Sequence, residues 1–127
     1  MKETASLEDR WAALASKLRA FVREREWEQF HDPKNLAMAL GSEAGELLAE
    51  FRWIASEHAD AHAHAGAERA RIEAEAADVG VALWLFCERT GIDLCDAMSR
   101  KIDSNALNYP VEGSRRRSER PHRKPET

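Results

Sequence analysis

The chain has 127 residues, a length that suits one domain rather than two. Gly and Pro are few, whereas Ala, Glu, Leu and Arg are abundant, and this composition predicts an all-α fold. The net charge of −4 argues against nucleic acid as the main partner. No run approaches the roughly 18 apolar residues of a membrane-spanning helix and the N-terminal residues form no apolar segment, so we expect a cytoplasmic protein without a membrane partner.

Charge is distributed unevenly along the chain. Residues 114–127 contain six Lys/Arg and two acidic residues, so this segment carries +4 while the remainder carries −8. An acidic body with a basic end is typical of a folded domain followed by a disordered extension. We therefore expect an all-α domain over residues 1–112 and a basic, disordered tail over residues 113–127.

Apolar residues at intervals of three and four predict the first two helices. The first is expected over residues 6–26, with Ser6 as its N-cap. The second is expected over residues 34–55. The segment between them, residues 27–35, breaks the pattern, because its Asp-Pro step disfavours helix before the proline.

Residues 56–66 (SEHADAHAHAG) follow the second helix and contain three histidines: His58, His62 and His64. Three histidines raise the possibility of a zinc site. The spacing is irregular and no Cys is adjacent, so we interpret the segment as a solvated loop.

Two further helices complete the predicted domain. The third is expected over residues 68–90, with Gly91 ending it. The fourth begins after Asp93 as N-cap and ends near residue 106. Its apolar positions, which include Met98 and Ile102, are expected to face inward.

The most informative pattern is a pair of carboxylates on each of two apolar helices. Glu43 and Glu46 are three residues apart, as are Glu75 and Asp78, so each pair shares a helix face. If the two helices pack antiparallel, the four acids can converge. Four hard anionic groups in one place need a counter-charge, and Mg²⁺ or Mn²⁺ is the usual one.

Two other interpretations fit the acidic pairs less well. Acidic pairs at this spacing are common on the surface of amphipathic helices, but one of the present pairs lies in a helix that is apolar nearly all round. A di-iron bundle uses paired acids with a His three residues after a Glu. Neither pair here has a His at that position, so the magnesium interpretation is favoured.

A divalent metal held by carboxylates is a standard way to bind a polyphosphate and to lower the pKa of a bound water. Lys101 would neutralise remaining phosphate charge, and the indoles of Trp27 and Trp53 could stack on a base. These residues together indicate a nucleotide hydrolase that uses no covalent nucleophile.

The chain resembles the all-α nucleoside triphosphate pyrophosphatases, the MazG-like superfamily, and within it the dCTP pyrophosphatase branch. The resemblance rests on WEQFHDPKNLAMALGSEAGELLAEFRW (27–53), EAADV (75–79) and KIDSNALNYP (101–110), and it covers roughly residues 6–111. It implies a four-helix-type protomer that assembles as a homodimer or a homotetramer. It also implies Mg²⁺-dependent hydrolysis of a (deoxy)nucleoside triphosphate to the monophosphate and pyrophosphate.

The resemblance also implies roles for individual residues. The family's catalytic metal ligands match Glu43, Glu46, Glu75 and Asp78. Aromatic positions that enclose the base match Trp27 and Trp53, and His31 lies in the same pocket motif. The positions that serve the phosphate end match Lys101, Asn105 and Tyr109.

The sequence departs from the family pattern at four positions. Ser42 replaces a further Glu of the classical members, which the dCTP branch also lacks, and Asn108 stands where many members have Lys or Arg. Leu18 and Ala82 stand where vertebrate members have polar or aromatic base contacts. The preferred substrate, a dCTP-like or modified pyrimidine deoxynucleotide, is therefore the least constrained part of the prediction.

One alternative from another class stays open at the level of sequence. A non-catalytic helical oligomer could bind a nucleotide or a protein partner through the same surfaces, with the basic tail as a contact. Metal-dependent release of pyrophosphate separates the two. The preferred base, the choice between dimer and tetramer, the role of the tail and the acid that orients the attacking water are not determined by the sequence.

Overall fold

The computed structural model describes residues 4–117, and within this range it is helical without strands. The predicted all-α fold is confirmed. The elements in chain order are α1 (Leu7–Glu24), the 3₁₀ turn η1 (Trp27–Phe30), α2 (Pro33–Ala49), η2 (Ser56–His58), α3 (Ala59–His64), α4 (Gly66–Thr90), α5 (Leu94–Asn108) and α6 (Val111–Ser114). Among these helices, none is long and apolar enough to cross a membrane.

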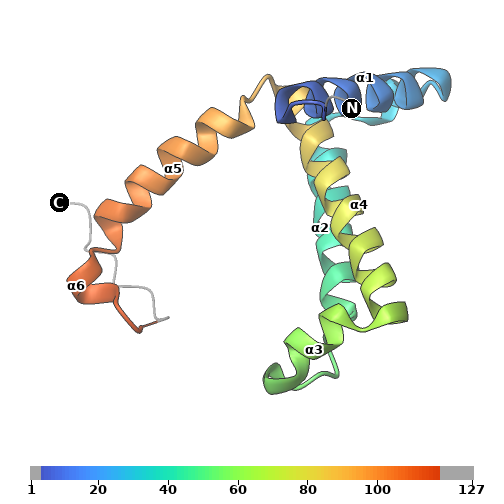
Figure 1. Ribbon diagram of the computed structural model, residues 1–127. Coiled ribbons are helices and arrows are strands. Elements are labelled where there is room, and N and C mark those ends of the chain that lie inside the picture. Colours follow the sequence, from blue (N-terminus) through green and yellow to red (C-terminus); the bar gives the residue numbers. More distant parts are fainter. Residues whose placement is uncertain (1–3, 118–127) are drawn as a thin grey trace. The chain divides into compact units, whose positions relative to one another are not determined.

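Two compact units divide between Thr90 and Gly91 (Figure 1). The first contains α1 to α4, and the second contains α5 and α6. The predicted boundary between residues 112 and 113 stays a prediction, because residues 118–127 of the expected tail lie outside the described range.

Helix α1 begins where its capping residues predict. The Ser6 Oγ accepts a hydrogen bond from the Asp9 N–H at 3.1 Å, and the Asp9 carboxylate accepts one from the Ser6 backbone N–H at 3.3 Å, which together form a capping box. Ala15 and Val22 are buried along the inner face of the helix. The Trp11 ring stacks on that of Trp84 in α4, with centroids 5.4 Å apart and planes 4° apart.

A sharp change of direction separates α1 from α2. Glu26 adopts a left-handed conformation (φ 53°) between α1 and η1. Asp32 then caps α2 by accepting from the Asn35 N–H at 2.9 Å, and Pro33 occupies the first helical position, where its missing N–H costs nothing. The capping aspartate and the proline together restart the helix.

Helices α2 and α4 pack side by side and run antiparallel, as the convergence of the acids requires (Figure 1). Leu36 of α2 and Ala82 and Cys87 of α4 are buried. This helix pair carries the residues on which the candidate site is built.

Helix α2 ends at Ala49, so the prediction that it continues to residue 55 is wrong. The carbonyl oxygen of Glu50 accepts a hydrogen bond from the His62 Nε2 at 2.9 Å. The backbone tightens at the same point, since Phe51 donates to the Leu48 oxygen at 3.0 Å. Apolar residues continue the helical spacing beyond Ala49. However, the Glu50 carbonyl, which would accept the next hydrogen bond of the helix, is bound by the His62 side chain instead.

The prediction of a loop over residues 56–66 is also wrong. The segment forms η2 and the short helix α3, which its many alanines favour. Besides the bond from His62 to Glu50, the His64 Nδ1 bonds to the Asp60 oxygen at 2.6 Å. Two of the three histidine rings therefore contact backbone carbonyls.

In the second unit, α5 begins after Asp93, whose side chain accepts from the Asp96 N–H at 3.0 Å. Gly91, at φ +69°, ends α4 in the left-handed region, as predicted. The expectation that Met98 and Ile102 face inward is wrong, because their side chains are 54% and 64% exposed. Periodicity identifies an apolar face of a helix but not what covers it.

Candidate functional site

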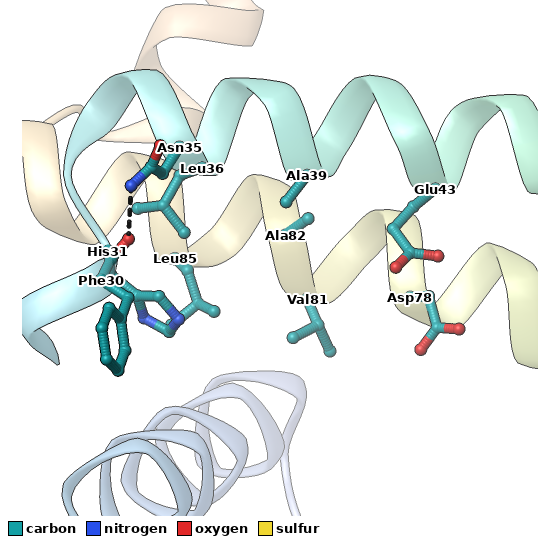
Figure 2. Close-up of a pocket in the computed structure, with 10 residues that line it drawn as sticks. All are labelled: Phe30, His31, Asn35, Leu36, Ala39, Glu43, Asp78, Val81, Ala82 and Leu85. Atoms are coloured by element: carbon teal, nitrogen blue, oxygen red, sulfur yellow. Dashed lines mark hydrogen bonds between the residues drawn. The ribbon is translucent and has the colours of Figure 1, made fainter. Parts of the chain in front are cut away.

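Three carboxylates meet between α2 and α4. Glu43 of α2 and Glu75 and Asp78 of α4 each contribute an oxygen, and these three oxygens lie within 4.8 Å of one another. We call these residues the acidic cluster. Figure 2 shows Glu43 and Asp78 facing each other from the two helices. The spacing of three residues places both α4 acids on the face toward α2.

The negative charge of the acidic cluster is not matched by nearby cations. Among the residues that the structure describes, no Lys or Arg forms an ion pair with any of the three acids. Partial burial raises the pKa of Glu75, and the charges of Glu46, Asp78, Glu43 and Glu50 raise it further. Carboxylate oxygens so close together are suited to a hard divalent cation, which would offset this repulsion.

Glu46, the fourth predicted ligand, lies outside the acidic cluster. Its side chain is exposed, and its charge is the largest carboxylate contribution to the raised pKa of Glu75. Glu50, one turn further on, is paired instead with Arg71 of α4, whose Nε lies 3.4 Å from the carboxylate. The structure therefore brings together three of the four acids and places the fourth beside them.

An elongated cavity of about 310 Å³ extends from the acidic cluster along the groove between α2 and α4. Glu43 and Asp78 lie at one end, and His31 and Phe30 lie at the other (Figure 2). The wall between them is apolar and is formed by Leu36, Ala39, Val81, Ala82 and Leu85. At the His31 end, the Asn35 side chain donates to the Phe30 carbonyl at 3.1 Å, which ties η1 to the first turn of α2.

The other predicted binding residues are placed as follows. His31 lines the cavity, but the indoles of Trp27 and Trp53 do not. The Trp27 ring contacts those of Phe21 and His31 edge-on, with centroids 5.6 and 6.5 Å apart, and Trp53 is 88% exposed. The predicted phosphate-end residues belong to the second unit, in or directly after α5: Lys101, Asn105 and Tyr109.

Sequence reasoning did not assign the apolar cavity wall to the site, although a signal was present. Counting back from Glu43 by helical steps of four and three reaches Ala39 and Leu36. Counting forward from Asp78 by four and three reaches Ala82 and Leu85. On both α2 and α4, the helix face that carries the acids also carries the apolar residues that line the cavity.

Comparison with curated proteins finds relatives named dCTP pyrophosphatase 1. The protein from Bos taurus is 41% identical over 95 residues, which are 75% of this chain and 56% of that protein. The human protein is 38% identical over 106 residues, 80% of this chain and 62% of that protein. The chain thus spans somewhat more than half the length of these curated relatives. No family model matches the sequence.

Among solved structures, the chain is similar to a pyrophosphatase from Archaeoglobus fulgidus. The TM-score is 0.75 at 30% sequence identity, and the match covers 85% of this chain and 99% of the archaeal chain. The likeness in fold and sequence therefore extends over the whole archaeal protein.

Proposed function

This chain belongs to the all-α, MazG-like nucleoside triphosphate pyrophosphatase family, and we propose that it hydrolyses a nucleoside triphosphate to the monophosphate and pyrophosphate. The observation that carries the proposal is the acidic cluster at one end of a cavity whose wall is apolar along most of its length. Such a cavity suits a ligand with a charged polyphosphate at one end and a less polar ring at the other. The proposed substrates are dCTP-like or modified pyrimidine deoxynucleotides, and the proposed role is housekeeping of the nucleotide pool.

The acidic cluster is proposed to hold Mg²⁺, with Mn²⁺ as a possible substitute. The donor set fits, because the three acids are hard oxygen ligands and their charges are unmatched by any Lys or Arg of the described chain. Glu43, Glu75 and Asp78 would be the ligands. When bound, the ion supplies charge neutralisation for the phosphates and lowers the pKa of a coordinated water.

The protein's own residues position the rest of the substrate. The apolar wall of the cavity, around Ala82 and Leu85, excludes water from the sugar and base. His31 offers a ring nitrogen at the end of the cavity remote from the acids (Figure 2). Binding at both ends fixes the distance between base and phosphates, and positioning supplies a large part of phosphoryl-transfer catalysis.

Several further roles are proposed from the family resemblance. Glu46 is a fourth metal ligand, or it acts on the acidic cluster by its charge. Trp27 and Trp53 stack on the base. The phosphate end is completed by Lys101, Asn105 and Tyr109.

Assembly as a homodimer or a homotetramer is also part of the proposal. It is supported by apolar side chains that a single chain leaves exposed. On α1 these are Leu7, Trp11, Leu14 and Phe21, and on α5 they are Met98, Ile102 and Leu107. Faces of this kind on a helical protein are suited to contact with another helical surface.

The test is pyrophosphate release from a panel of deoxynucleoside triphosphates and modified analogues, with Mg²⁺ and with EDTA. Release that requires the metal supports the proposal, and the order of rates identifies the base. If a protein with a normal helical circular dichroism spectrum releases pyrophosphate from none of them, the enzyme hypothesis is wrong. The non-catalytic binding module would then be favoured.

A further inference from the structure

An ion pair lies beyond the acidic cluster, on the side opposite the cavity. On α4, a step of four residues back from Glu75 reaches Arg71, and after α2 a step of seven residues on from Glu43 reaches Glu50, so both remain on the helix faces that carry the acids. The Arg71 Nε donates to the Glu50 carboxylate at 3.4 Å. The proposed function gives Arg71 no role.

The ion pair holds Arg71 loosely. Its 3.4 Å distance to Glu50 is longer than the usual range of about 2.7–3.2 Å for such a hydrogen bond, and its Nη2 lies 3.9 Å from the Glu68 carboxylate. The Arg71 side chain is 55% exposed, whereas that of Glu50 is 19% exposed, and the Glu50 carbonyl is bound by His62. Exposed ion pairs contribute little to stability. Arg71 can therefore leave Glu50 for a stronger anionic partner at small cost.

The order of groups along the groove relates Arg71 to a bound triphosphate. The cavity ends at Glu43 and Asp78, Glu75 lies next along α4, and Arg71 lies four residues further, roughly 6 Å along the helix axis. A nucleotide with its base in the cavity directs its phosphates toward the acids in the order α, β, γ. The γ-phosphate is therefore the group that extends furthest toward Arg71.

Resting on the proposed function, we propose that Arg71 binds the terminal phosphate of the substrate and exchanges its contact with Glu50 for this phosphate when the nucleotide binds. A terminal phosphate carries close to two negative charges at neutral pH, and a guanidinium group donates to two of its oxygens at once. Arg71 then favours triphosphates over diphosphates. The departing pyrophosphate contains the same phosphate, so Arg71 also contacts this product.

The experiment measures binding of two analogues that resist cleavage, α,β-imido-dCTP and α,β-imido-dCDP, which differ only in the terminal phosphate. Calorimetric titration of the full chain in Mg²⁺ gives Kd for each. Arg71→Gln should weaken binding of the triphosphate analogue about tenfold, as expected for loss of a charge-assisted hydrogen bond, and should leave the diphosphate analogue unchanged. Arg71→Lys keeps the charge and should restore part of the loss. Inhibition of turnover by added pyrophosphate should weaken in Arg71→Gln as well.

Two further variants serve as controls. Arg69→Gln removes an exposed guanidinium that lies about 200° around α4 from Arg71 and forms no ion pair within residues 4–117, so both Kd values should stay constant. Glu50→Gln removes the carboxylate that competes for Arg71, so it should tighten binding of the triphosphate analogue. Weaker binding in Glu50→Gln would contradict the exchange of partners.

The possible results separate this proposal from the one on which it rests. If folded protein binds neither analogue and hydrolyses no nucleotide, both are wrong. If triphosphates are hydrolysed but Arg71→Gln weakens both analogues equally, or neither, only the proposal for Arg71 is wrong. Titration of Mn²⁺ without nucleotide provides the last arm. If Arg71→Gln lowers affinity for Mn²⁺ by the same factor as for the triphosphate analogue, Arg71 acts on the metal site and the phosphate contact is wrong.

Discussion

The two ends of the groove between α2 and α4 differ in what they contribute. At one end Leu36, an uncharged side chain that is 3% exposed, packs in the apolar wall of the cavity. At the other end the acidic cluster concentrates carboxylates, and the pKa of Glu75 is raised by partial burial and further by repulsion from the neighbouring carboxylates. One end favours association of the helices, and the other end opposes it.

This difference indicates how the fold tolerates the cluster. Apolar burial at the Leu36 end stabilises the helix pair, so that α2 and α4 can hold like charges close together at the other end. A cation that binds the acids removes a repulsion that folding alone leaves in place. The predictions below test this division, from the largest expected effect to the smallest.

The largest effect is expected at the acidic end. Glu43→Gln and Asp78→Asn should reduce pyrophosphate release by more than the roughly 10- to 100-fold that loss of an outer-shell partner costs a metal site. The helical circular dichroism signal should remain, because these changes remove repulsion rather than packing. Rates and spectra measured on the same preparations provide the test, and wild-type turnover by either variant would show that the metal-site model is wrong.

The next effect belongs to the apolar end. Leu36→Ala should lower the free energy of unfolding by about 2–5 kcal/mol, because it removes a buried side chain and leaves a cavity. Met38→Ala, on the same helix but at a 64% exposed position, serves as control and should change stability by about 0.5 kcal/mol or less. Urea unfolding followed by circular dichroism measures both. Equal losses in the two variants would contradict the assignment of the core to the Leu36 face.

A smaller effect distinguishes the two acids of α2. Glu46→Gln should reduce activity by about tenfold or less if Glu46 acts through its charge on Glu75, since an exposed charge is well screened. Glu43→Gln, measured in the same assay, shows how much activity is lost when a metal ligand is removed. If the two substitutions cost the same, Glu46 coordinates the metal directly.

The smallest effect is on pH dependence. Because the pKa of Glu75 is raised, the metal-free fold retains a proton on Glu75 at pH values where the unfolded chain has lost it. This contribution to stability is present in acid and is lost as the pH rises through the raised pKa. Metal binding needs the deprotonated form, so affinity for Mg²⁺ or Mn²⁺ should weaken as the pH falls through the same value.

Calorimetric titration of Mn²⁺ over a pH series measures this dependence. Glu46→Gln should move the fall in affinity to lower pH, because it removes the largest carboxylate contribution to the raised pKa. Glu73→Gln, an exposed change on α4 that does not contribute to the pKa of Glu75, should leave the pH dependence where it is in the wild type. An unchanged midpoint in Glu46→Gln would exclude charge coupling between Glu46 and Glu75.

Local signals in the sequence were sufficient for most of the helices. Ser6 and Asp93 cap α1 and α5 as predicted, because a capping side chain bonds to the backbone a few residues away. The end of α2 was not predictable in this way. The Glu50 carbonyl is bound by His62, twelve residues later in the chain, and the residues around Glu50 do not predict such a contact.

The candidate site shows the same limit. Helical spacing was enough to pair Glu75 with Asp78 and to suggest their convergence with Glu43. It could not exclude Glu46 from the cluster, since i and i+3 residues share a face but point in directions that differ by about 60°. A second cavity beside the first, lined among others by Arg19, Glu28 and Arg89, was not predicted, because its charged residues come from α1, η1 and α4, and only the packing of these elements brings them together.

The stack of Trp11 on Trp84 has an optical consequence. The two rings join α1 to α4, and they lie nearly parallel, one over the other, in the folded chain, whereas Trp53 is almost fully exposed. Emission from the stacked pair depends on contact between the helices, and emission from Trp53 resembles that of an indole in water whether the chain is folded or not. The contribution of the Trp11–Trp84 pair to the intrinsic fluorescence therefore reports, without an added label, whether α1 is docked on α4.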